Sequence, residues 1–157
     1  MKNKGVTIIE LSVVILVIGL IVFSLSPFVR IAREKIYNTR AVKNLQKMSI
    51  ALREFAAENN QTLPATLALI HSEGFLSDEK VFDSPFSQHA GSAQDPDYIY
   101  MAEDNLYEAE NKILIYEKKD SSVNGTVYAL YLNGDIERVP ITKDGTIAGT
   151  MNGAMAE

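Results

Sequence analysis

The chain contains no cysteine and only two histidines, which removes most of the side chains that build catalytic and metal sites. Without cysteine there is neither a disulfide framework nor a thiolate metal centre. His71 and His89 are far apart in the sequence, and neither stands in a metal-ligand or nucleophile spacing. No glycine-rich phosphate loop precedes a helix. The sequence therefore predicts no catalytic site, and we expect a protein that is not an enzyme.

Positive charge is also scarce. The 157 residues include 15 lysines and arginines against 20 aspartates and glutamates, which gives a net charge of −5. A chain this acidic is a poor nucleic-acid binder, so no nucleic acid is expected among its partners. Its length suits one globular domain together with an anchoring segment.

The longest apolar run lies near the amino terminus. No residue from 11 to 29 is charged, and as a helix rising ~1.5 Å per residue this run matches the ~30 Å hydrocarbon core of a bilayer. Lys2 and Lys4 precede it, and Glu10 stands at its start. A carboxylate within a membrane segment is costly and is functional by default. We therefore predict a transmembrane helix at 6–29, with Glu10 as its functional residue.

Residues 4–11 read Lys-Gly-Val-Thr-Ile-Ile-Glu-Leu. This stretch resembles the cleavage and methylation signal of type IV prepilins and of the pseudopilins of type II secretion. Three residues of the following helix also fit that signal: Ser12, Gly19 and Pro27. The resemblance implies that residues 1–5 are a leader, that a prepilin peptidase cuts after Gly5, and that it methylates the new amine of Val6. Val6 stands where the family usually has phenylalanine.

Cleavage would place an ammonium group at Val6, four residues from Glu10 and on the same face of the helix. In a medium of low dielectric constant both charges need a partner, either within one chain or in a neighbour. The resemblance implies the second arrangement, in which Glu10 pairs with a neighbouring subunit and directs assembly. A secretory signal peptide is the alternative, but its apolar segment spans only ~7–15 residues and ends in a small-residue cleavage site.

Apolar residues recur at three- and four-residue steps from about 29 to 58, so we expect one helix from residue 6 to about 58. Pro27 lies inside it and predicts a kink, either where the helix leaves the membrane or at a hinge. After a breaker cluster at 59–64 we expect a short helix at 65–72 and a long loop at 77–97. Four strands are predicted at 98–101, 112–117, 126–132 and 135–139. The Asn133-Gly134 pair is a strong hairpin signal between the last two.

These elements predict an α+β protein. Their layout resembles the pilin fold, in which a long N-terminal helix has a membrane half and an amphipathic half, and the latter packs on a small antiparallel sheet. The expected division is a leader at 1–5, a transmembrane helix at 6–29, a globular domain at 30–141 and a flexible C-terminal tail at 142–157.

A basic cluster lies just beyond the apolar run: Arg30, Arg33, Lys35, Arg40 and Lys43. Counted alone, these residues favour a cytoplasmic position for this side of the membrane. The leader implies the opposite orientation in a bacterial inner membrane. In that orientation the single-pass chain has a cytoplasmic N-terminus and a periplasmic globular domain.

Four residues in and beside the long loop offer hard oxygen ligands of the kind that calcium takes: Asp95, Asp97, Asp104 and Asn105. Major pseudopilins have a calcium-stabilised loop, so the resemblance makes calcium the one cofactor to test. The spacing of these residues matches no calcium motif, and a solvated acidic loop is the alternative.

The resemblance implies a structural pseudopilin that polymerises into a short periplasmic filament of a type II secretion-like system for protein export. Its implied partners are further copies, other pseudopilins, the prepilin peptidase, an inner-membrane assembly platform and membrane lipid. The lack of cysteine favours this class over pilins with a C-terminal disulfide loop. Two alternatives stay open. One is a type IV pilus pilin or minor pilin for adhesion, motility or DNA uptake, and the other is a membrane-anchored binding module that does not polymerise.

Overall fold

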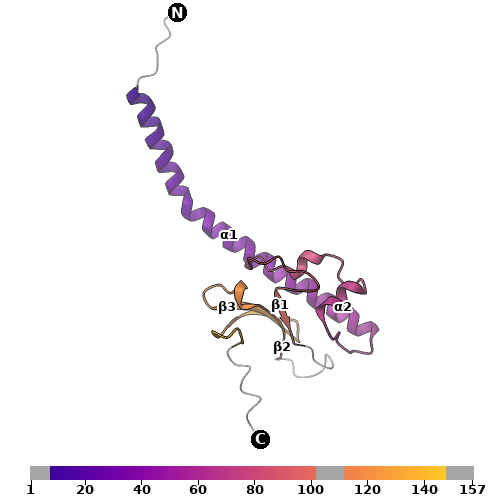
Figure 1. Cartoon of the computed structure of the whole chain (residues 1–157). Coiled ribbons are helices and arrows are strands. Elements are labelled where there is room, and N and C mark those ends of the chain that lie inside the picture. The colour runs from indigo at the N-terminus through magenta and orange to yellow at the C-terminus, as the bar shows by residue number, and fades with distance from the viewer. Residues whose placement is uncertain (1–7, 102–111, 148–157) are drawn as a thin grey trace, which may run out of the picture. The chain divides into compact units, whose positions relative to one another are not determined.

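A computed structural model of the chain is shown in Figure 1. It describes residues 8–101 and 112–147, without the side chains of residues 25–30. The chain divides into two compact units, Met1–Ile36 and Tyr37–Glu157. Helix α1 (Ile8–Glu58) contributes its first part to one unit and its second part to the other.

In the first unit α1 begins at Ile8 and passes through Pro27 as an α-helix. The long helix predicted from residue 6 is thus confirmed from Ile8 onward, whereas Gly5 and Val6 lie outside the described residues. The kink at Pro27 stays a prediction. Across residues 8–101 and 112–147, the structure contains no helix with both the length and the apolar character needed to cross a membrane.

In the second unit α1 is amphipathic, as the sequence predicts. Its buried face recurs at three- and four-residue steps and consists of Ala41, Leu45, Met48, Leu52 and Phe55. The helix ends where Asn60 and Gln61 adopt positive φ angles of 55° and 66°, and the Gln61 amide donates to the carbonyl of Ala56 at 2.8 Å. These left-handed residues stop the helix within the predicted breaker cluster.

Two short helices follow before the sheet. Helix α2 (Leu67–Ser72) confirms the expected second helix and buries Leu67 and Ile70. The predicted loop at 77–97 also contains a 3-10 helix, η1 (Glu79–Phe82), whose first turn is capped by the side chain of Asp78. Val81 and Phe82 of η1 are buried, so this part of the loop belongs to the core.

The four predicted strands form one antiparallel sheet in the order β1-β2-β3-β4. They are β1 (Tyr98–Tyr100), β2 (Ile113–Glu117), β3 (Thr126–Tyr131) and β4 (Ile136–Pro140), with the 3-10 helix η2 (Lys119–Ser121) after β2. Each lies within a residue or two of its predicted bounds. The α+β class is therefore confirmed.

The sheet has apolar side chains on both faces. One face joins α1 in the main core, where Leu45 and Met48 belong to the same buried cluster as Ile115 and Leu130. The other face forms a second cluster around Val127 and Ala129. Alternation along β3 explains the division, because successive residues of a strand point to opposite faces.

The second cluster corrects the predicted C-terminal tail. Ile147 is only 4% exposed and belongs to that cluster, and it forms an isolated bridge with Ile141. Between them the Thr142 amide donates to the carbonyl of Thr146 at 2.8 Å. Burial of Ile147 thus extends the packed domain six residues past the predicted boundary at 141. Residues 148–157 lie outside the described part of the chain.

Two Asn-Gly pairs close turns of the sheet. Asn133-Gly134 joins β3 to β4 as predicted, and Gly134 has a φ of 98°. At Asn124-Gly125, φ is 54° and 72°, and the flanking residues Val123 and Thr126 exchange backbone hydrogen bonds. Positive φ at both central residues is the signature of a type I′ turn.

Candidate functional site

The most unusual surface of the protein is the first part of α1. Every residue from 8 to 24 is exposed, and the large apolar side chains among them are between 47% (Val17) and 87% (Ile8) exposed. We call this segment the apolar arm. A helix that is apolar all round is normally buried in a core, a membrane or an interface. The surface therefore needs a partner outside the unit that carries it.

The apolar arm contains one charged residue, Glu10, in the first turn of α1. A carboxylate there interacts favourably with the positive end of the helix dipole. The hydroxyl of Ser12 donates to the carbonyl of Ile9 at 2.8 Å, so this polar group is satisfied by its own helix. Glu10 is therefore the only formal charge that a covering environment would have to accommodate along residues 8–24.

Gly19 lies in the middle of the apolar arm. A Cβ atom built there would meet no atom within 4 Å, so packing within the described residues does not require a glycine. Glycine inside a helix costs about 1 kcal/mol relative to alanine. A reason for Gly19 has to come from outside this unit, and close approach of another helix is one that small residues allow.

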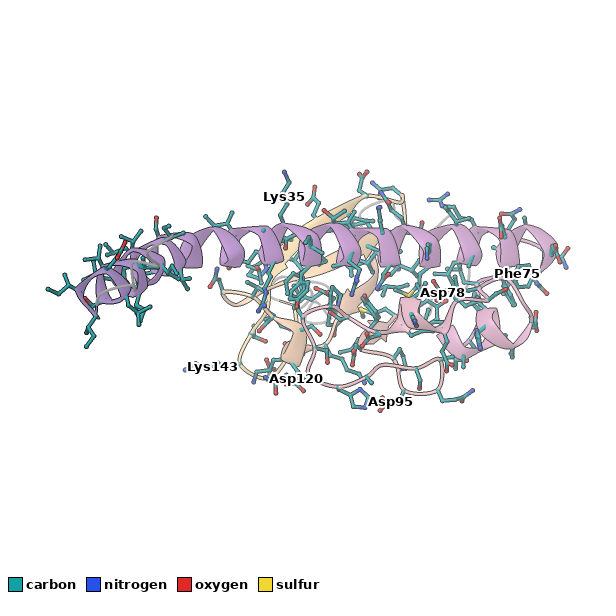
Figure 2. The ribbon with its side chains drawn as sticks, turned by 90° about the horizontal axis from the view of Figure 1, so that it is seen from above. Lys35, Phe75, Asp78, Asp95, Asp120 and Lys143 are labelled. Atoms are coloured by element: carbon teal, nitrogen blue, oxygen red, sulfur yellow. The ribbon has the colours of Figure 1, made fainter. Side chains whose placement is uncertain are left out.

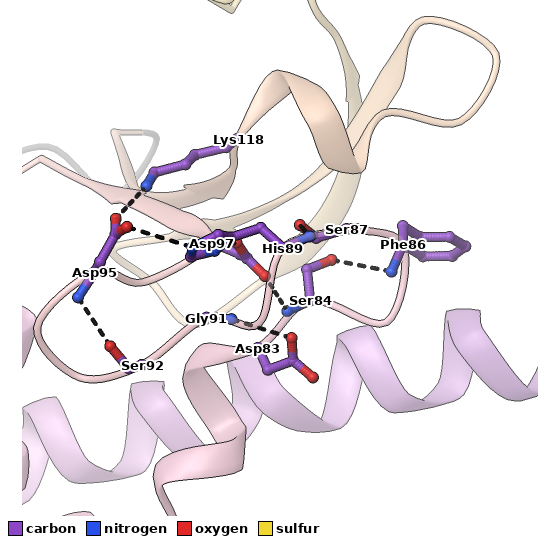
Figure 3. A network of polar contacts seen from close by, with 10 residues as sticks. All are labelled: Asp83, Ser84, Phe86, Ser87, His89, Gly91, Ser92, Asp95, Asp97 and Lys118. Carbon is purple, nitrogen blue, oxygen red and sulfur yellow. Dashed lines mark hydrogen bonds and ion pairs between the residues drawn. The ribbon is translucent and has the colours of Figure 1, made fainter.

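The long loop is held to the sheet by three buried polar side chains, which we call the loop clamp: Ser84, Asp97 and Glu117. Figure 3 shows the first two of them. The Ser84 amide donates to Asp97 at 3.0 Å, and the Ser84 hydroxyl donates to Glu117 at 2.8 Å. The second Glu117 oxygen accepts the backbone amide of Tyr128 at 2.9 Å. The clamp thereby joins Ser84 of the loop to Asp97, to β2 and, through Glu117, to β3.

Glu117 is the most deeply buried charged group of the described chain, with 1% of its surface exposed. Burial raises the pKa of the Glu117 carboxyl above its usual value, and the hydrogen bonds from Tyr128 and Ser84 and the positive charge of Arg138 oppose that rise. Its hydrogen-bond donors come from the loop and from β3, so its position depends on the assembled domain.

An aromatic cluster connects the same loop to α1 and the sheet. Phe86 stacks on Tyr128 and meets Tyr37 edge-on, with ring centroids 6.5 Å and 5.9 Å apart. Arg138 lies over the Tyr128 ring, with 4.7 Å from its guanidinium carbon to the ring centroid, and donates to Asn38 at 2.8 Å. These contacts fix the carboxyl-terminal half of the sheet against α1 within the second unit.

Two of the four predicted calcium ligands lie close together around His89 (Figure 3). Its ring nitrogens are 3.6 Å from Asp95 and 3.2 Å from Asp97, and Asp95 also pairs with Lys118 at 2.9 Å. The pairing with Lys118 lowers the pKa of the Asp95 carboxyl. A cation placed here would have to compete with these partners.

The other two predicted ligands, Asp104 and Asn105, lie outside the described residues. Within residues 8–101 and 112–147, no group of three or more histidines and acids is arranged to hold a metal ion. Calcium binding therefore remains a prediction that depends on all four residues together.

No family model, no curated protein and no solved structure matches this chain.

No local sequence pattern predicts the loop clamp. Glu117 follows the apolar residues 113–116 directly and occupies the last position of β2, where a charged side chain usually marks the exposed end of a strand. Ser84 lies within the long loop and Asp97 at its end, and neither belongs to a recognisable sequence motif. The bond from Ser84 to Glu117 spans 33 residues of sequence, and no local pattern predicts such a distant contact.

Proposed function

We propose that this protein is a structural pseudopilin of a type II secretion-like system. It is stored as a single-pass protein of the bacterial inner membrane, with the globular unit in the periplasm. It polymerises with copies of itself and with other pseudopilins into a short filament. A prepilin peptidase processes it and an inner-membrane platform assembles it.

The observation that supports this proposal most strongly is the apolar arm with its single carboxylate. Glu10 follows the Lys4-Gly5-Val6 signal at the distance that puts the new amine one helical turn away. An exposed apolar helix carrying one charge has two complementary environments, lipid for storage and the helices of neighbouring subunits for assembly. The second offers each charge a partner of opposite sign on a neighbouring subunit.

Membrane storage is supported by the sequence. Residues 11–29 carry no charge, and this run extends five residues past Ser24, the last described side chain of the apolar arm. The satisfied hydroxyl of Ser12 also suits a medium without water.

The arrangement of the second unit supports a pilin-like fold. The amphipathic part of α1 packs on one face of a four-stranded antiparallel sheet, and a loop between them is held by buried polar contacts. Fold alone does not define function, so the proposal relies on the N-terminal signal and the apolar arm.

Intact-mass analysis of the protein extracted from membranes tests the proposal. We expect a chain that begins at methylated Val6. As a matched pair, Gly5→Val should leave the full precursor in the membrane, whereas Asn3→Val, two residues upstream, should still be processed. A chain that retains Met1, or one cut beyond residue 26, would overturn the proposed processing.

A further inference from the structure

Charge is divided very unevenly along the chain. Residues 30–53 contain seven lysines and arginines and one glutamate, a net charge of +6. Residues 54–157 contain six basic and 18 acidic residues, a net charge of −12. The proposed function uses the apolar arm but gives no role to the basic segment that follows it.

Arg33 and Lys35 belong to this basic segment and to the first unit. Each residue from 31 to 36 is exposed, so this part of α1 presents its whole circumference. Figure 2 shows the side chain of Lys35 extending away from the helix axis. Two apolar neighbours on the same stretch, Ile31 and Ile36, are 65% and 56% exposed. The segment thus combines exposed cations with exposed apolar surface, the composition of a membrane-interface helix.

The distance of Arg33 and Lys35 from the end of the apolar run matches the depth of the lipid headgroups. If residues 11–29 fill the hydrocarbon core, Arg33 and Lys35 follow four and six residues later, about 6 Å and 9 Å farther along the helix axis. The headgroup layer is about 5–8 Å thick on each side. Long basic side chains extend back toward that layer from slightly beyond it. Both cations therefore reach the level of the phosphate groups.

We propose that Arg33 and Lys35 bind the headgroups of anionic phospholipids and hold the stored subunit at the membrane surface. The inference rests on the proposed membrane storage. Guanidinium and ammonium groups form charge-assisted hydrogen bonds with phosphate oxygens. The orientation rule for membrane proteins places lysines and arginines mainly on the cytoplasmic side. Headgroup binding accounts for a basic cluster on the opposite side.

The acidic half of a second copy is the competing partner for these cations. The position of Arg33 and Lys35 favours lipid, because they follow the apolar run immediately and meet headgroups as soon as that run enters a bilayer. A second copy reaches them only after assembly.

The test uses the full chain reconstituted into phosphatidylcholine bilayers with a trace of spin-labelled lipid. Electron paramagnetic resonance reports the fraction of spin-labelled lipid that the protein immobilises. The measurement is made once with labelled phosphatidylglycerol and once with labelled phosphatidylcholine. We expect a preference for phosphatidylglycerol. Each basic residue near an anionic surface strengthens binding up to about fivefold, so Arg33→Gln with Lys35→Gln should reduce the preference several-fold. Salt at about 1 M, with a screening length of ~3 Å, should do the same.

The matched control is Lys80→Gln with Lys143→Gln, which removes the same charge from exposed positions of the second unit and should leave the preference unchanged. Equal immobilisation of the two lipids would overturn the headgroup proposal while leaving the anchor intact. A preference that survives in the Arg33 and Lys35 variant would also overturn it. Crosslinking of Lys35 to a second copy, without any lipid preference, would assign the cations to the acidic half of a neighbour. No immobilised lipid of either kind would overturn membrane storage itself.

Discussion

Replacing Glu117 should reveal whether the loop clamp stabilises the domain through hydrogen bonds or through charge. The ladder between β2 and β3 ends with Tyr116 opposite Ala129, and the next backbone amide of β3, that of Tyr128, is bonded by the Glu117 side chain instead. The other Glu117 oxygen accepts the hydroxyl of Ser84. Glu117 therefore replaces a missing strand partner and holds the loop at the same time.

The size of the effect follows from the two donors. Glu117→Leu removes the acceptor of the Tyr128 amide, which is half-buried, and that of the buried Ser84 hydroxyl. At about 1–3 kcal/mol for each unsatisfied donor, the free energy of unfolding should fall by ~2–6 kcal/mol. Replacing a buried ion by an apolar residue is often neutral when nothing else loses its partner. Here two donors lose theirs, and that loss should dominate.

Glu117→Gln is the matched control, because it keeps the shape and one carbonyl oxygen. The side-chain amide of the introduced glutamine can donate to the Ser84 oxygen while its carbonyl accepts the Tyr128 amide, so the loss should be about 1 kcal/mol or less. Urea unfolding of a soluble fragment of residues 30–157 measures all three proteins. Leucine and glutamine variants of equal stability would refute the hydrogen-bond account.

The free energy of unfolding of the wild type and that of Glu117→Gln should depend differently on pH. Burial raises the pKa of Glu117 in the folded state, so the folded protein binds this proton more tightly than the unfolded chain does. The contribution of Glu117 to the free energy of unfolding should therefore decrease as the pH rises from its ordinary pKa of 4.5 through the raised folded value. Glu117→Gln lacks this contribution, so its stability should decline less than that of the wild type over this range.

Two further predictions concern the long loop. A Cβ atom at Gly91 would lie 2.2 Å from the carbonyl oxygen of Phe82. Gly91→Ala should therefore force the loop to shift and should lower the free energy of unfolding by about 1–3 kcal/mol. Ala90→Ser, at the exposed neighbouring position, should have little effect in the same urea assay. If calcium binds this loop, a hundredfold excess over its dissociation constant should stabilise the fragment by about 2.7 kcal/mol and raise its melting temperature, and Asp95→Asn should reduce that rise. An unchanged melting temperature at millimolar calcium would assign these carboxylates to a solvated loop.

Local patterns were enough to predict the elements of the fold. The apolar steps of α1, the breaker cluster after Glu58 and the alternation of the strands all depend on neighbours in sequence, and the structure places these elements close to the predicted bounds. The hairpin at Asn133-Gly134 was predicted for the same reason, since the conformation of Gly134 is a local property.

Features that depend on tertiary contacts could not be predicted in the same way. Ile147 is a single apolar residue in a stretch rich in glycine and threonine, and it becomes core only because it reaches the second face of the sheet. Glu117 is buried only because Ser84 and the Tyr128 amide supply donors for it. The composition of a short segment does not report such distant partners.

The central claim is that Glu10 is needed for assembly and not for folding or anchoring. Glu10 belongs to the first unit, whereas the main core is built in the second on residues such as Leu45 and Leu52. Glu10→Leu should therefore leave the globular unit folded. In a bilayer it removes a costly carboxylate, so anchoring of the single subunit should be unharmed or improved.

Filament yield in membranes carrying Glu10→Leu tests this claim most directly. In the proposed filament the variant would leave the amine of a neighbouring Val6 without its partner, and loss of one member of a buried pair should weaken assembly by about a hundredfold or more. Glu34→Leu, which removes the same charge from an exposed position farther along α1, should assemble normally. We expect a Glu10→Leu protein that is made, inserted and cleaved but forms no filaments. Filaments at the wild-type level would contradict it and would favour a membrane-anchored module that does not polymerise.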